Sequence, residues 1–406
     1  KKKMRGELMH LLESSVRGLR ASADERFVRK VLDEVPRVGF YQGGNIAPED
    51  IPLPSVLRAC MRFLGEPYGF TNLNLHQKEW QIDNAAMLYT AVTGAAFRFV
   101  WRFLECPAGS IDAMYRTVYG DQEIARGMQA AGYNYRLLLT PAYAHQIGYT
   151  GERIPKEAAL RRLIVDSIRD RARPAIGLGV VGGSEPCIIN GYDQDGAVLM
   201  GWAYTLPALN RSEQLEFTPS GYFRKRGWYQ DTLGIALLGE KRARPPLKEI
   251  YRQALEWGLE QQRLGEVEGV PAGWASYSEW AETFLNADNF PPRKIPGFNG
   301  VYGYLNPVIW ELAERRWYAA MFMEYMLHQT SGIPEGPLCA ARDCFQHEHD
   351  LMWKIFNMVN GGGDAVNLDI LMDETVRRLV ADVILEARES DIQAAGHIER
   401  LLQNNW

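Results

Sequence analysis

The sequence lacks any long hydrophobic run and any large excess of one charge. No stretch of about 18 residues is apolar throughout, so we expect no membrane-spanning helix and no membrane partner. Lys and Arg number 45 and Asp and Glu number 50, which gives a formal net charge of -5. Proteins that bind nucleic acid usually carry a basic face, so this balance argues against a nucleic-acid partner.

Cysteine is scarce as well. The five cysteines, at positions 60, 106, 187, 339 and 344, form an odd and sparse set that favours reduced thiols. The basic start, Lys1–Met4, leads into a stretch that carries Glu7 and Arg17 rather than an uninterrupted apolar segment, so we expect no signal peptide. We therefore expect a cytoplasmic protein.

The sequence also lacks a clear motif for a cofactor or a metal. The glycine-rich run Gly182–Ser184 is followed by no lysine and no helix start, so it is not a phosphate-binding loop. The run Cys339–Asp350 holds two cysteines and two histidines on one predicted helix, on which His347 and His349 point in different directions. Structural zinc requires four converging ligands, so we expect no metal and no cofactor.

Aromatic residues, by contrast, are plentiful, with 11 Trp and 19 Tyr. Trp and Tyr combine a large apolar surface with one hydrogen-bonding tip. They fill the core of a large protein, and they also line pockets for small organic ligands. The counts alone leave both interpretations open.

The stretch from Arg173 to Trp202 organises the predicted fold. It contains three short apolar runs, Ala175–Val181, Cys187–Asn190 and Ala197–Gly201, separated by turn residues. Runs of this length that are rich in Val and Ile indicate buried strands, and Asp-Gly before an apolar run indicates a tight turn. We predict a β-meander at the centre of a sheet.

Periodicity predicts the other elements. Helices are expected over 4–34, 55–64, 83–93, 111–132, 156–171, 247–264, 277–285, 308–327, 338–359 and 374–402. Strands are expected over 38–45, 95–103, 133–139, 215–217 and 232–238, and a loop over 221–229. Ser55 is the expected N-cap of the second helix, because its hydroxyl can accept a hydrogen bond from a free backbone N–H.

The character of the chain changes near residue 243. The basic and proline-containing run Arg242–Pro246 resembles a linker, and after it the apolar spacing is helical throughout. We predict an α+β fold in which a helical extension (1–36) precedes an α+β domain (37–242) and a helical bundle domain (247–406). The N-terminal helix and the aromatic-rich helical domain make a homodimer plausible.

Five segments carry a resemblance to a known family. They are PLPSVLRACMRFLG (52–65), RRLIVDSIRDRARPAIGLGV (161–180), CIINGYDQDGAVLMGW (187–202), WAETFL (280–285) and LAERRWYAAMF (312–322). The first three resemble papain-like proteins of the bacteriocin-leader-peptidase kind, in particular the N-terminal domain of the butirosin-biosynthesis protein H family. The last two are similar to the helical C-terminal part of the same relatives.

The resemblance implies a papain-like cysteine-peptidase-type domain followed by an all-helical domain. In such proteins a cysteine opens a helix, and a histidine opens the strand that runs into Gly-Tyr-Asp. The segment Phe63–Gly65 then puts the nucleophile near Pro52, and counting back from Gly191 puts the histidine between Glu185 and Cys187. No Cys or Thr stands at the first position and no His at the second, so the Cys–His dyad is absent.

Two other side chains are candidate nucleophiles. Cys187 stands at the mouth of the central strand with Glu185 two residues away on the same predicted face. A cysteine at a strand start is also an ordinary core residue. Ser55 is the hydroxyl nearest to the expected nucleophile position, but it needs a base that the sequence does not identify. Glu49 and Asp50 in the preceding loop are either an acid/base pair or solvated loop residues.

Polar and aromatic residues near the predicted cleft are candidates for ligand binding. They are Tyr41, Gln42, Trp80, Gln81, Asp83, Tyr89, Asn190 and Trp202. The expected ligand is a small organic metabolite, bound between the 52–65 helix and the central strands.

Two classes of function follow. In the first, a degenerate papain-like protein binds a small molecule or another protein without turnover, which the missing dyad favours. In the second, an enzyme uses Cys187 or Ser55 for acyl transfer or for amide (C–N) hydrolysis, as the resemblance implies. The missing dyad also argues against an intracellular protease.

Overall fold

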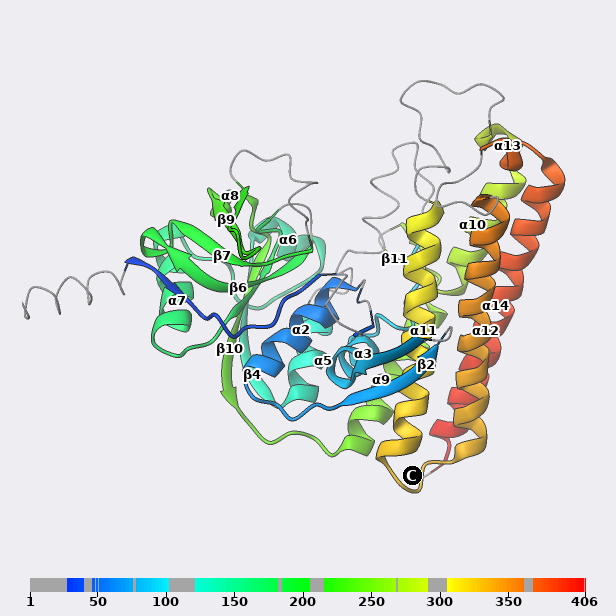
Figure 1. Cartoon of the computed structure of the whole chain (residues 1–406), viewed down its shortest axis with the longest axis horizontal. Coiled ribbons are helices and arrows are strands. Elements are labelled where there is room, and N and C mark those ends of the chain that lie inside the picture. The colour runs from blue at the N-terminus through cyan, green and yellow to red at the C-terminus, as the bar shows by residue number, and fades with distance from the viewer. Residues whose placement is uncertain are drawn as a thin grey trace, which may run out of the picture.

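The computed structural model describes most of the chain, and Figure 1 shows a sheet-containing lobe beside a lobe of long helices. The described residues are 28–39, 46–47, 49, 51–75, 78–101, 121–181, 185–204, 215–267, 269–290, 305–360, 368–404 and 406. For residues 73–75, 78–80, 305–307 and 368 only the backbone is described. The predicted α+β class is confirmed: the fold mixes helix and sheet and ends in a helical region.

A single antiparallel sheet forms the sheet-containing lobe. Its strands follow the order β4 (Tyr133–Leu139), β10 (Gly234–Lys241), β5 (Ala175–Leu178), β6 (Pro186–Asp193), β7 (Val198–Trp202), β9 (Phe223–Arg226) and β8 (Leu215–Phe217), and β1 (Lys30–Val31) pairs with β6. The predicted meander is confirmed, because β5, β6 and β7 are adjacent at the centre. The turn between β6 and β7 needs left-handed backbone at Gln194, Asp195 and Gly196. Asp and Gly tolerate that conformation better than most residues, which explains the Asp-Gly pair.

Nine of the twelve described helices correspond to predicted ones, and the short helices at 141–146, 228–231 and 368–371 were not predicted. The twelve are α2 (Pro52–Phe63), α3 (Asn84–Val92), α5 (Asp121–Ala131), α6 (Pro141–Gln146), α7 (Glu157–Arg169), α8 (Trp228–Asp231), α9 (Leu247–Arg263), α10 (Trp274–Leu285), α11 (Leu305–Gln329), α12 (Glu335–Asn360), α13 (Leu368–Leu371) and α14 (Glu374–Leu402). Two small hairpins that the sequence did not predict complete the described fold: β2 (Phe70–Leu75) with β3 (Lys78–Asp83), and β11 (Glu266–Val267) with β12 (Val270–Pro271).

Four predicted elements are wrong within the described residues. Lys30–Val31 is a strand rather than the end of a helix, because its backbone pairs with Gly191 and Tyr192 of β6. The predicted loop at 221–229 contains β9, whose alternating Phe-Arg-Lys-Arg side chains suit a sheet position between β7 and β8. Val38 and Gly39 belong to no strand. Residues 4–27, 40–45 and 111–120 of the predicted elements lie outside the described residues.

The segment 95–101 is also not the predicted strand of the sheet. It begins as a turn and then runs extended into the helical lobe, where Val100 bridges to Ala272. Phe99 and Trp101 pack against Tyr277 and Trp280 of α10. Because this segment is buried on every side, its alternating pattern carried no information about a sheet face.

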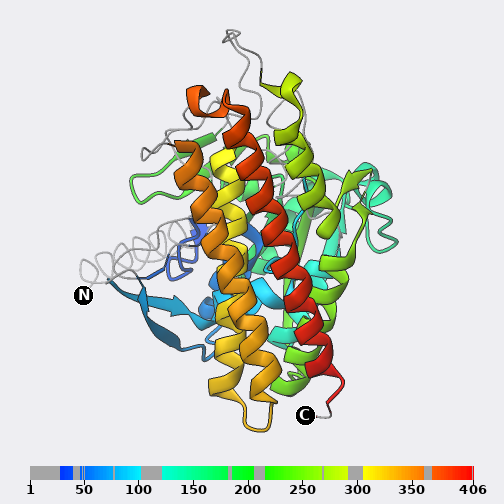
Figure 2. The same cartoon turned by 90° about the vertical axis from the view of Figure 1, so that its right-hand side faces the viewer.

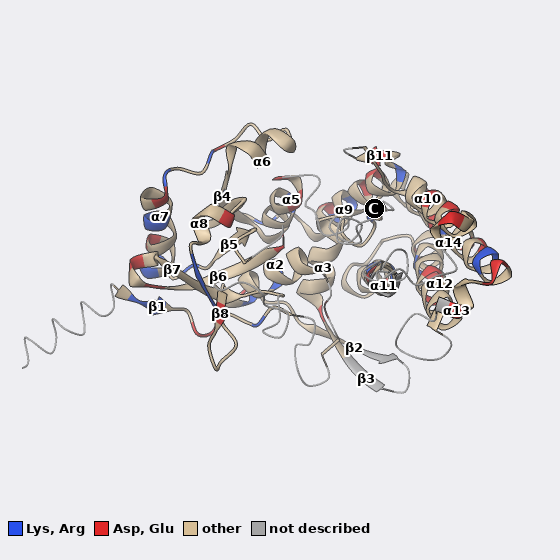
Figure 3. Ribbon diagram, turned by 90° about the horizontal axis from the view of Figure 1, so that it is seen from above, with Lys and Arg blue, Asp and Glu red and all other residues tan. Residues whose placement is uncertain are grey.

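The two lobes share one hydrophobic core. One cluster of buried residues includes Ile188 of β6, Leu57 of α2, Leu255 of α9 and Phe322 of α11. Figure 3 shows α2 and α3 lying between the sheet and α11, in agreement with the packing of α2 on β6 and of α3 on α11. In Figure 2, α12 and α14 run side by side on the outer face of the helical lobe.

None of the helices in the described part of the chain is both long enough and apolar enough to cross a lipid bilayer.

Candidate functional site

The N-terminal end of α2 lies at the edge of the sheet where β6 begins and β7 ends. Ile188, near the start of β6, pairs with Trp202 at the end of β7. Two residues further on, the Tyr204 hydroxyl donates to the backbone oxygen of Glu49 over 2.7 Å. Glu49 precedes α2 by three residues, so strand ends and helix start meet at one place. We call Glu49, Ser55, Arg58 and Tyr204 the head cluster.

Glu49 is the centre of the head cluster. Ser55 Oγ donates a hydrogen bond to Glu49 Oε2, and Arg58 Nε lies 3.0 Å from Oε1. Arg58 Nη2 also donates to the backbone oxygen of Arg37 over 2.9 Å. The side chains of Glu49, Ser55 and Arg58 are almost fully buried, and that of Tyr204 is partly buried. The interpretation of Glu49 as a solvated loop residue is therefore wrong, and Asp50 lies outside the described residues.

Burial controls the acidity of the head cluster. It raises the pKa of the Glu49 carboxyl above its usual value, against the opposing effects of Arg58 and Ser55. Tyr318 of α11 is buried within electrostatic range of the same carboxylate, and burial raises its pKa well above the ordinary value, with Glu49 adding to the shift. The helical lobe thus contributes a phenol to the surroundings of the head cluster.

The start of α2 offers few hydrogen-bond donors. The helix begins at Pro52, with Ile51 as its N-cap and no side-chain cap. Pro52 and Pro54 have no N–H, and the Ser55 N–H donates to the Ile51 oxygen. Proline suits the first turn because its N–H would have no partner there, which is why the helix starts earlier than predicted and Ser55 is not its N-cap. A helix start of this kind cannot supply the pair of N–H groups that stabilises an oxyanion.

The described thiols of the sheet-containing lobe are core residues. Cys187 is fully buried on β6 opposite Gly177, and burial raises its thiol pKa, to which Glu185 adds. Glu185 therefore disfavours the thiolate rather than activating it. Burial likewise raises the pKa of Cys60 to about 12. The structure supports the interpretation of both as small buried hydrophobes.

Asp83 and Tyr89, two predicted ligand-binding residues, are hydrogen-bonded to side chains outside the head cluster, although the charge of Asp83 also raises the pKa of Glu49. Asp83 is the N-cap of α3 and accepts from Arg62, in the last turn of α2, over 2.8 and 3.1 Å. Tyr89 is fully buried with its hydroxyl 2.7 Å from that of Tyr68. Gln81 is partly exposed and donates to the Asn72 side chain over 3.0 Å.

Asn190 and Trp202 lie on the strands next to the head cluster. Asn190 is fully buried and donates to the Leu32 oxygen over 2.9 Å, so it fastens the N-terminal segment to β6. Trp202 is half-buried, donates to the Val35 oxygen over 3.1 Å, and stacks on Tyr222 with ring centroids 4.3 Å apart. Tyr41 and Gln42 lie outside the described residues, as does the side chain of Trp80.

Of the predicted residues, Ser55 belongs to the head cluster and Trp202 lies two residues before Tyr204, and the structure adds three residues that sequence reasoning missed. Arg58 lies one helical turn after Ser55, and this i, i+3 spacing was a usable signal. Tyr204 follows a strand end without any local pattern. Tyr318 comes from a helix far along the chain, and no local signal in the sequence links it to Glu49.

The part of the chain described by the structure contains no group of three or more His, Cys, Asp or Glu side chains arranged to hold a metal. In the Cys339–Asp350 run, His347 lies 3.2 Å from Glu386 and His349 binds the Ala313 oxygen at 2.9 Å. These two rings engage different helices, as their spacing on α12 requires.

Comparison with known proteins gives no identification, since no protein-family model matches the chain and no curated protein sequence matches it significantly.

Proposed function

We propose that this chain has a papain-like fold without a Cys–His dyad and binds a small organic metabolite beside the head of α2. The observation that carries the proposal is the composition of that helix start. Pro52 stands where the resemblance expects a nucleophile, and it has neither a nucleophilic side chain nor an N–H. Papain-type acyl chemistry needs both, so binding without turnover suits these residues better.

Two further observations support the proposal. An α-helix packed against an antiparallel sheet, with its start beside the ends of β6 and β7, is the arrangement that a papain-like domain requires. The aromatic pair Trp202–Tyr222, with the exposed Arg37 guanidinium 6.0 Å from the Trp202 ring, provides a face suited to a small organic ligand.

A second candidate function rests on the Ser55–Glu49 hydrogen bond. A carboxylate whose pKa is raised is a stronger base, and one that accepts from a serine hydroxyl is placed to remove its proton. In that case Ser55 Oγ would attack a carbonyl carbon and Glu49 would take the hydroxyl proton. Glu49 would pass that proton to the amine or alcohol that leaves as its bond to the carbonyl carbon breaks, and an acceptor amine or water would then release the acyl group from Ser55. The pairing of Glu49 with Arg58 weakens this role, since the guanidinium lowers the basicity that burial adds.

Chemical labelling distinguishes the two functions. The folded chain is treated near neutral pH with iodoacetamide and with a fluorophosphonate probe, and modified residues are mapped by mass spectrometry. We expect slow labelling at Ser55, Cys60 and Cys187, because each is buried. Fast fluorophosphonate labelling of Ser55 that is lost in Glu49→Gln would contradict binding without turnover and favour the hydrolase or acyltransferase. Denatured protein serves as the control for probe competence at the cysteines.

A further inference from the structure

The outer face of α11 and α12 carries an exposed aromatic patch far from the head cluster. Trp310 is 40% exposed and Trp353 is 37% exposed, unusual values for such large apolar side chains. Both rings pack on Phe356, with centroids 5.8 and 5.5 Å away. These three side chains, which we call the outer patch, form one continuous surface and mark an interaction site.

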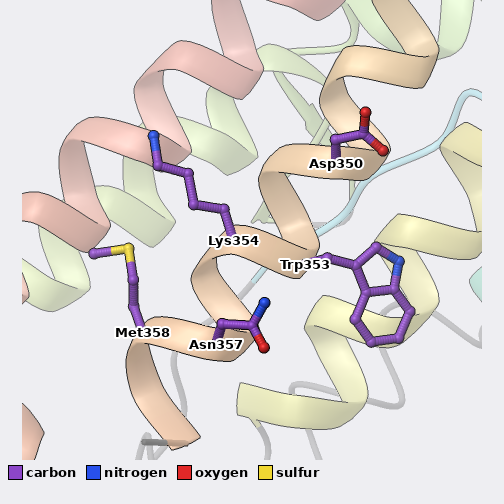
Figure 4. A pocket seen from close by; sticks show the side chains of 5 residues that line it. All are labelled: Asp350, Trp353, Lys354, Asn357 and Met358. Atoms are coloured by element: carbon purple, nitrogen blue, oxygen red, sulfur yellow. The ribbon is translucent and has the colours of Figure 1, made fainter. Parts of the chain in front are cut away.

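Charges of both signs flank the outer patch along α12. A shallow depression of about 530 Å³ lies there, lined by Asp350, Trp353, Lys354, Asn357 and Met358. Figure 4 shows Trp353 pointing to one side of the helix and Lys354 to the other, with Asp350 one turn away. Asp350 and Lys354 are both exposed and stand four residues apart. Their backbone positions are therefore about 6 Å apart along the axis of α12.

We propose that the outer patch binds a second copy of this chain, with the two α12 helices packed antiparallel about a two-fold axis. An axis level with Met352 puts Asp350 of one copy opposite Lys354 of the other, twice by symmetry. The same axis puts the two Trp353 rings about 3 Å apart along the helices, within stacking range. Asn357 then lies opposite His347, an exposed polar residue on the same helix.

The charges beside the outer patch favour a second copy of this chain as the molecule that binds there. Asp350 and Lys354, which flank the outer patch, lie in an order along α12 that pairs opposite charges when a second copy runs antiparallel, as an isologous interface requires. A strongly acidic or basic partner would meet one like charge at this surface. Lys354 Nζ approaches only to 3.9 Å of Glu386 on α14, so its ammonium makes a weak contact within its own chain. Asp350 accepts one hydrogen bond, from Gln346 over 3.0 Å.

Charge exchange tests this arrangement in the full chain. Sedimentation velocity between about 5 and 100 µM measures the dimer population of the wild type, Asp350→Lys, Lys354→Asp and the double variant. Each single variant sets two pairs of like charges across the axis, so we expect dimer affinity to fall by about tenfold or more. The double variant restores opposite charges, and its affinity should return to within about threefold of the wild type.

Two further variants keep the test specific. Trp353→Ala should abolish the dimer, whereas Leu379→Ala, which truncates a 50% exposed residue on α14, should leave it unchanged. Circular dichroism verifies that every variant is folded. A wild-type chain that stays monomeric across this range overturns the proposal. So does a dimer that survives both single exchanges, since another surface would then hold it, or a double exchange that fails to restore affinity.

Discussion

At the scale of single residues, the head cluster is a buried carboxylate held between a hydroxyl and a guanidinium. An ionised carboxylate loses its hydration when it is buried, and it needs partners for the lone pairs that water no longer satisfies. Ser55 and Arg58 supply them from adjacent turns of α2, which ties the loop residue Glu49 to the helix. The cluster therefore stabilises the fold, whatever binds beside it.

Replacement of Ser55 by alanine separates a structural hydroxyl from a catalytic one. The substitution removes a hydrogen bond to a buried carboxylate, and we expect the free energy of unfolding to fall by about 1.5–3 kcal/mol. Urea denaturation of both proteins measures the difference. Ser220→Ala, at an exposed turn, should change stability by less than about 0.5 kcal/mol. An unchanged or increased stability of the Ser55 variant would indicate a strained catalytic site instead.

At the scale of elements, α11 joins the two lobes through two consecutive arginines. Arg315 Nη1 donates to the Ala95 oxygen over 2.7 Å, and Arg316 Nη1 donates to the Ala96 oxygen over 2.8 Å. Both carbonyls belong to the segment that follows α3. Their buried oxygens therefore accept hydrogen bonds from side chains of the helical lobe.

Arg316 also contacts two buried carboxyls. Its Nε lies 2.8 Å from Glu348 on α12 and 3.3 Å from Asp391 on α14, and Nη2 donates to the Tyr277 hydroxyl. All four side chains are fully buried. Burial raises the pKa of Glu348 well above its ordinary value, and the neighbouring Asp391 adds to that rise against the effect of Arg316. One guanidinium thus lies between two buried carboxyls, and burial favours the protonated form of Glu348.

Glu348 should make stability depend on pH. Its folded-state pKa exceeds its unfolded-state pKa, so between these two values the folded protein binds more protons than the unfolded chain does. That contribution to stability is complete below the unfolded pKa and declines as pH rises toward the folded value. The decline is at most about 1.4 kcal/mol for each pH unit.

Glu348→Gln, which resembles the protonated acid, isolates this effect. The difference in unfolding free energy between variant and wild type, measured from pH 5 to pH 8, should shift steadily in favour of the variant. Glu335→Gln, an exposed position on the same helix, should give a difference that stays flat. A flat difference for Glu348→Gln as well would mean that Glu348 is ionised in the folded state.

The sequence predicted elements best where one face is apolar and the other polar. The long helices α9, α12 and α14 and the strands of the meander fall within a few residues of their predicted bounds. The segment 95–101 was wrongly predicted as a strand. It is buried on all sides, so the alternation of its side chains does not indicate which face is apolar. The start of α2 was missed because Pro52 and Pro54 were read as loop residues rather than as first-turn residues.

At the scale of the whole molecule, the site depends on contacts between distant parts of the chain. Glu49, Tyr204 and Tyr318 come from three separate segments. They come near each other because the sheet packs on α2, and α11 packs on α3, which in turn packs on α2. Ser55 and Trp202 were proposed from the sequence, and each lies in a segment that carries the family resemblance. Asp83 and Tyr89 were proposed as ligand-binding residues because they are polar or aromatic residues near the predicted cleft. In the structure, Asp83 accepts hydrogen bonds from Arg62, and the Tyr89 hydroxyl is hydrogen-bonded to that of Tyr68.

Because the two lobes share a hydrophobic cluster, we expect them to unfold together. Residues of α9 and α11 pack in the same cluster as the strands, so the proposed ligand site and the helical lobe have a common support. A ligand that binds only the folded chain raises its stability by mass action. Ligand binding at the head of α2 should therefore be visible in the unfolding of the whole molecule.

A thermal-shift screen is the measurement that tests binding at the head of α2 most directly. The wild type is heated with a panel of amino acids, amines, small carboxylic acids and aminoglycosides, each at about 1 mM. We predict that at least one compound raises Tm by about 2 °C or more. The shift should be largely lost in Trp202→Ala and kept in Trp310→Ala, each compared with its own ligand-free Tm. Stabilisation that is equal in the Trp202 variant, or absent across the panel, would contradict the proposed binding site.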